Sequence, residues 1–146
     1  MSRSGYSDEI DDQWALIRWR GAVKSAIRGK RGQAFLREMA TALDAMPDKS
    51  LIAEELEQDG EVCALGAVGK ARGIDMGPID PEEYEVVSKT FGIPDALARE
   101  IMYENDCDWR DETPQQRWER IRNWVDKQIK KEPEPCLNTT PLTPNP

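Results

Sequence analysis

The chain has 146 residues, of which 38% are hydrophobic and 33% are charged, and its formal net charge is −8. This length suits one domain that buries a core without disulfides or metal, and the three cysteines form no CxxC pair. The absence of histidine excludes Ser-His and Cys-His nucleophile pairs, and no segment approaches the roughly 18 apolar residues of a membrane span.

Charge and proline content divide the chain into regions. Residues 1–40 carry eight Lys and Arg against five Asp and Glu, whereas residues 41–100 carry five against fourteen. The last fifteen residues include five prolines and no apolar period. We therefore expect a flexible N-terminus over 1–10, a helical domain over 11–131 and a disordered Pro-rich tail over 132–146.

Two helices are predicted in the first third of the chain. Spacings of three and four residues place Leu16, Trp19, Val23 and Ile27 on one inward face of the first helix. Gly29 is a natural stop, and residues 29–32 form a short linker. The inward residues of the second helix are Phe35, Leu36, Met39, Leu43 and Met46. The short linker predicts that these helices are antiparallel neighbours.

The segment 51–69 allows two interpretations. The dipeptide Asp59-Gly60 is typical of a β-hairpin, whereas the small apolar residues 62–69 share a helical face. The flanking alanines and acidic residues are poor strand formers, so we favour a helix and keep a short hairpin as the alternative.

Three more helices are predicted. The run Asp80-Pro81-Glu82-Glu83 predicts a start with a capping box, and Gly92 ends that helix. Another follows Pro94, with Leu97, Ile101 and Met102 inward, and residues 104–112 are expected to be irregular. Thr113-Pro114-Gln115-Gln116 is the clearest helix start, and it precedes Trp118, Ile121, Val125 and Ile129 at helical spacing. The chain is thus expected to be all-α, a bundle of about five helices.

A basic stretch in the first two helices suggests a binding surface for an anionic partner. Its members are Arg18, Arg20, Lys24, Arg28, Lys30 and Arg31. Lys30 and Arg31 precede a predicted helix N-terminus, where the helix dipole disfavours cations but a bound anion would favour them. The alternative is a solvated face that pairs with the acidic middle of the chain.

Two tryptophans lie off the predicted apolar faces. Trp14 and Trp124 fall outside the helical stripes that contain Trp19 and Trp118. Exposed tryptophan is frequent in protein interfaces, so both are candidate interface residues. The alternative is that they pack at the edges of a small core.

Several segments together resemble a family of small, uncharacterised bacteriophage and prophage proteins. The resemblance runs from Trp14 to about Ile129, and it is carried by four segments: Arg18 to Gly21, Arg28 to Phe35, Val62 to Gly69 and Arg117 to Arg120. It implies a phage origin and a bacterial host cell, but it implies no chemistry and no catalytic residues.

These observations predict a non-enzymatic, phage-encoded accessory protein that binds a host or phage macromolecule as a regulator or defence inhibitor. The expected partner is a protein, and the expected location is the bacterial cytoplasm, without membrane, cofactor or metal. The alternative is a nucleic-acid-binding regulator that uses the basic N-terminal helices. A less favoured alternative is a carboxylate and Mg²⁺ phosphoryl-transfer enzyme with a carboxylate or lysine base.

Overall fold

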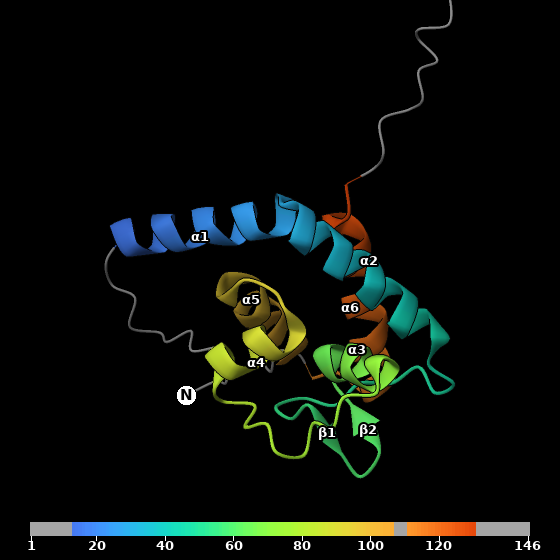
Figure 1. Cartoon of the computed structure of the whole chain (residues 1–146). Helices are drawn as coiled ribbons and strands as arrows, with labels where there is room; N and C mark the ends of the chain where they lie inside the picture. Colours follow the sequence, from blue (N-terminus) through green and yellow to red (C-terminus); the bar gives the residue numbers. More distant parts are fainter. Residues whose placement is uncertain (1–12, 107–110, 131–146) are drawn as a thin grey trace, which may run out of the picture.

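The computed structural model describes residues 13–106 and 111–130 and shows a small all-α fold, as predicted (Figure 1). Its elements are α1 (Gln13–Arg28), α2 (Lys30–Ala45), β1 (Glu57–Gln58), β2 (Glu61–Val62), α3 (Ala64–Arg72), α4 (Tyr84–Phe91), α5 (Asp95–Asp106) and α6 (Pro114–Gln128). The segments predicted as a flexible N-terminus (1–10) and as a Pro-rich tail (132–146) lie outside the described residues, as do residues 11, 12 and 131 of the predicted helical domain.

The segment 51–69 contains both a hairpin and a helix. β1 and β2 pair antiparallel, with Glu57 opposite Val62. The two turn residues, Asp59 and Gly60, have φ angles of 54° and 84°, which is the left-handed backbone that a two-residue hairpin turn requires. The predicted helix is confirmed only from Ala64 onward, where the Cys63 sulfur accepts a hydrogen bond from the N–H of Gly66 at 3.4 Å.

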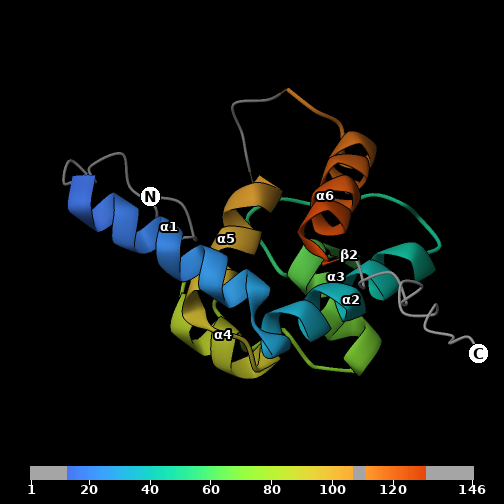
Figure 2. The same cartoon turned by 90° about the horizontal axis from the view of Figure 1, so that it is seen from above.

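The prediction that the first two helices are antiparallel is wrong. Only Gly29 separates them, and α2 continues from the end of α1 with a bend in both views (Figures 1 and 2). The residues predicted as a linker, Lys30 to Gly32, form the first turn of α2. A Cβ on Gly32 would lie 1.8 Å from the carbonyl oxygen of Ala26, so the turns abut too closely for any side chain at this position.

The core lies around α2, which contacts α1, α3 and α6. All but one of the residues predicted inward on α2 are fully buried, and Met46 is half-buried. Phe35 meets Phe91 of α4 edge-to-face, with ring centroids 6.1 Å apart. The Arg72 guanidinium lies over both rings and pairs with Glu38 at 2.6 Å. This cluster joins α2, α3 and α4.

The predicted helix starts have mixed outcomes. The capping box of α6 is confirmed, since Thr113 Oγ1 accepts from the Gln116 N–H and the Gln116 side chain accepts from the Thr113 N–H. The start at Asp80 is wrong. Its carboxylate accepts from the N–H of Glu82 at 2.9 Å, in a local turn, and the helix begins only at Tyr84.

The boundary of α5 also differs from the expectation. Gly92 ends α4 as predicted, and Leu97, Ile101 and Met102 are buried. However, the helix extends to Asp106, so the first part of the segment predicted to be irregular is helical. Residues 107–110 of that segment lie outside the described residues.

Candidate binding surface on α1

The first two turns of α1 project beyond α4 and α5 in both views (Figures 1 and 2). The inward face predicted for this helix is therefore only partly correct. Val23 is buried, and Trp19 and Ile27 are half-buried, but Leu16 is 43% exposed because its turn extends past the helices beneath. This end of the helix thus presents apolar side chains to solvent.

The side of α1 that faces away from the core combines apolar and basic residues. Trp14 is 69% exposed and Ile17 is 55% exposed. Steps of three and four residues connect them with exposed residues along the helix. We call this set the outer face of α1, and its members are Trp14, Ile17, Arg18, Gly21, Lys24 and Arg28.

The six predicted cations divide into two groups. The side chains of Arg18, Lys24, Arg28 and Lys30 are exposed, and they make no ion pair or hydrogen bond to another side chain or backbone group within the described ranges. Arg20 instead pairs with Glu100 of α5 at 3.2 Å, and the Glu100 side chain is only 7% exposed. Arg31 donates to the carbonyl oxygen of Gly92 at 2.8 Å.

Arg31 has a structural role that the sequence analysis did not find. Several helix ends converge beside the N-terminal half of α2. Arg31 and Arg72 donate to the carbonyls of Gly92 and Phe91 at the end of α4, and Arg37 donates to the carbonyl of Lys130 just after α6. Cations are favourable at the carbonyl ends of helices. The position of Arg31 is therefore explained without a bound anion.

Gln33 connects the ends of α1 and α6. Its amide donates to the carbonyls of Ile27 at 2.8 Å and Gln128 at 3.0 Å, and its oxygen accepts from the N–H of Lys130 at 2.8 Å. Gln33 is buried, with 8% exposure. The amide therefore fixes the end of α1 to α2 and α6, and the direction of the projecting part of α1 depends on this joint.

The two candidate tryptophans are not brought together. Trp124 is half-buried and packs against the core from α6, whereas Trp14 lies in the first turn of α1. Ile17 was missed as an interface candidate, although helical spacing places it beside Trp14 and about 120° around the helix from Val23. The aromatic part of the candidate surface is therefore Trp14 alone.

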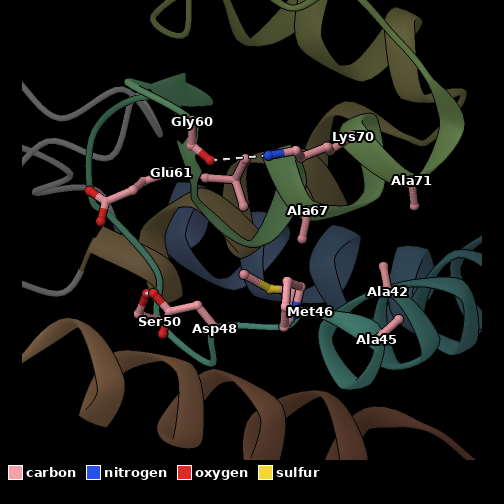
Figure 3. Close-up of a pocket in the computed structure, with 12 residues that line it drawn as sticks. Ala42, Ala45, Met46, Asp48, Ser50, Gly60, Glu61, Ala67, Lys70 and Ala71 are labelled. Carbon is pink, nitrogen blue, oxygen red and sulfur yellow. Dashed lines mark hydrogen bonds between the residues drawn. The ribbon is translucent and has the colours of Figure 1, made fainter.

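A cavity of about 350 Å³ lies between the end of α2, the hairpin and α3 (Figure 3). Its lining is mainly apolar and includes Ala42, Met46, Pro47, Val62, Ala67 and Ala71. Lys70 Nζ donates to the carbonyl of Gly60 at 3.1 Å on one side. The cavity can hold a small apolar group, and none of the predicted site residues lines it.

Within residues 13–106 and 111–130, no cluster of three or more Cys, Asp or Glu side chains could hold a metal ion. No helix in the same part of the chain is both long enough and apolar enough to cross a membrane. Comparisons with known proteins found no matching family model, no matching curated protein and no matching solved structure. The resemblance to a phage family therefore remains a prediction from the sequence.

Proposed function

We propose that the chain is a non-enzymatic accessory protein that binds an acidic protein partner through the outer face of α1. The observation that carries this proposal is the exposure of Trp14 and Ile17 beside Arg18, Lys24 and Arg28 on a projecting helix. Tryptophan and arginine are enriched among residues that dominate binding energy at protein interfaces. An amphipathic helix that projects from a domain can dock its apolar side into a groove.

The charge distribution supports an anionic partner. Between Gln13 and Arg37 the sequence has seven Lys and Arg and no Asp or Glu, although the whole chain has a net charge of −8. Arg20, Arg31 and Arg37 are used inside the fold, so Arg18, Lys24, Arg28 and Lys30 remain for a partner. The combination of cations with exposed apolar side chains favours a protein over nucleic acid, because phosphate contacts need cations but no apolar anchor. Phage-encoded host modulation is part of this proposal, on the sequence resemblance alone.

The test is site-specific photo-crosslinking in the cells that make the protein. A photoreactive amino acid at Ser25, which is exposed next to the outer face, leaves Trp14 and the cations intact. The matched control places the same group at Val86 of α4, which is 42% exposed. We expect a discrete protein adduct from position 25 that resists nuclease, and no comparable adduct from position 86.

Charge variants complete this test. The double variant Arg18→Glu and Lys24→Glu should lower the adduct yield at least tenfold, whereas the control Lys89→Glu on α4 should not. An adduct that nuclease removes would overturn the protein partner in favour of nucleic acid. Equal yields from positions 25 and 86 would show that the outer face of α1 is not a binding surface.

A further inference from the structure

Gly21 lies in the middle of the outer face of α1, and nothing in the described fold requires a glycine there. A Cβ built on Gly21 would meet no atom within 4 Å other than its chain neighbours and the backbone of its own helix, so no close packing against another element excludes a side chain. Its backbone φ is not positive, in contrast to Gly60, Gly73 and Gly92. Glycine in an exposed helix lowers helix stability relative to alanine. Gly21 therefore lowers the stability of α1, and nothing in the described fold explains why a glycine is present there.

A glycine on an exposed helix face leaves the backbone bare. Ile17 and Lys24 lie one turn away on either side of Gly21, and Trp14 lies one turn beyond Ile17. Helices that cross at small residues approach at the short end of the usual 8–10 Å range of axis separations. Gly21 is thus the point on the outer face at which a second helix could approach most closely, with Trp14 and Ile17 as apolar neighbours.

The charge of α1 identifies the chemistry of that second helix. α1 contains Arg18, Arg20, Lys24 and Arg28 and no carboxylate. A second copy of α1 does not fit, because antiparallel crossing at Gly21 would place Arg18 opposite Lys24 of the other copy. Parallel crossing would likewise align identical cations. An acidic helix satisfies both the shape and the charge.

We infer that a helix of the partner, with acidic flanks, crosses the outer face of α1 and makes its closest backbone approach at Gly21. This inference rests on the proposed function, and it adds the partner's secondary structure, its charge and the contact point. It makes an unusual prediction: a substitution that stabilises the free protein should weaken its complex.

The experiment compares Gly21→Ala and Gly21→Leu with the control Ala22→Leu, which adds bulk to an exposed residue about 100° around the same helix. Gly21→Ala should raise the melting temperature by about 3 °C, because alanine loses less chain entropy in a helix. The adduct yield from the photoreactive group at position 25 should fall about threefold for Gly21→Ala and at least tenfold for Gly21→Leu. The yield from Ala22→Leu should stay within twofold of that of the unsubstituted chain.

Mass spectrometry of the adduct supplies the second measurement. The crosslinked peptide of the partner should be acidic and helical in the partner's structure. A crosslink to a strand or to a basic segment would overturn the inference, and so would an unchanged yield in Gly21→Leu. If yield is lost in the charge variants but not in Gly21→Leu, the proposed function stands and the helix crossing is wrong. If position 25 gives no protein adduct in the unsubstituted chain, both are wrong.

Discussion

The joint made by Gln33 gives the most direct test of how α1 is held. Gln33→Ala removes three hydrogen bonds, to Ile27 at 2.8 Å, Gln128 at 3.0 Å and Lys130 at 2.8 Å. Each such bond contributes about 0.5–1.5 kcal/mol, and a buried group left unsatisfied costs about 1–3 kcal/mol. Since water can reach some of these helix ends after the truncation, we expect a loss of about 3 kcal/mol in the free energy of unfolding.

The assay is urea unfolding followed by circular dichroism, together with a thermal melt. A loss of about 3 kcal/mol corresponds to a melting temperature about 10 °C lower for a domain of this size. The control is Gln115→Ala in the first turn of α6, where the side chain is exposed, and we expect a change within about 0.5 kcal/mol. An equal, small loss in both variants would refute the assignment of Gln33 as the joint.

Gln33→Glu distinguishes the contribution of the hydrogen bonds from that of side-chain packing, because it changes the hydrogen-bonding groups and leaves the side-chain volume nearly unchanged. The introduced carboxylate keeps the acceptor for the Lys130 N–H but faces the carbonyl oxygens of Ile27 and Gln128. These oxygens raise the pKa of the introduced carboxyl in the folded state above its unfolded value of about 4.3. The penalty is therefore full at neutral pH and is relieved as the pH falls through the raised pKa. A loss that does not change with pH would contradict this reasoning.

Three further predictions concern the ion pair between Glu38 and Arg72 and the residues that follow α6. The hydrogen bond from Arg72 lowers the pKa of Glu38 below its ordinary value of 4.5. The stability that this pair contributes is therefore present above pH 4.5 and is lost as the pH falls through the lowered pKa. Glu38→Gln should cost at most about 1 kcal/mol at pH 7, because Glu38 is 39% exposed, and its urea unfolding curve should converge with that of the unsubstituted chain as the pH falls through the lowered pKa. Deleting residues 132–146 should change the melting temperature by less than about 4 °C, because that segment has no apolar period. Removing residues from Lys130 onward should lower it further, because Lys130 bonds Gln33 and Arg37.

Local signals in the sequence predicted the parts of the fold that local contacts determine. The Thr113 capping box was predictable because both of its hydrogen bonds lie within four residues. The start at Asp80 was mispredicted because an aspartate carboxylate can accept a backbone N–H either as a helix cap or in a local turn. Here it accepts from the N–H of Glu82 in a turn, and this bond competes with the helix cap. The sequence alone does not show which of these geometries the rest of the fold supports.

The path from α1 to α2 depends on contacts that no local pattern reports. A short linker is compatible with a reversal of direction or with a bend, and the bend is supported by the close approach of Gly32 to Ala26 and by the bonds of Gln33 to α6. The partner of Arg20 is 80 residues away in the sequence. Long-range contacts of this kind determine which cations of the predicted site have partners within the fold, as Arg20 and Arg31 do.

The six cations of the basic stretch do not all test the same thing, because some of them have partners within the fold. The sequence places Arg20 and Arg31 in one basic stretch with Arg18 and Lys24, and no local pattern shows which of the four has a partner within the fold. In the fold, Arg20 pairs with Glu100 and Arg31 donates to the carbonyl of Gly92, whereas Arg18 and Lys24 are exposed. Substituting Arg20 would remove an ion-pair partner from the carboxylate of Glu100, whose side chain is only 7% exposed, and removing a partner of a buried charge destabilises a fold. Loss of binding in an Arg20 or Arg31 variant would therefore report on folding as much as on the surface, whereas substitutions at Arg18 and Lys24 report on the surface alone.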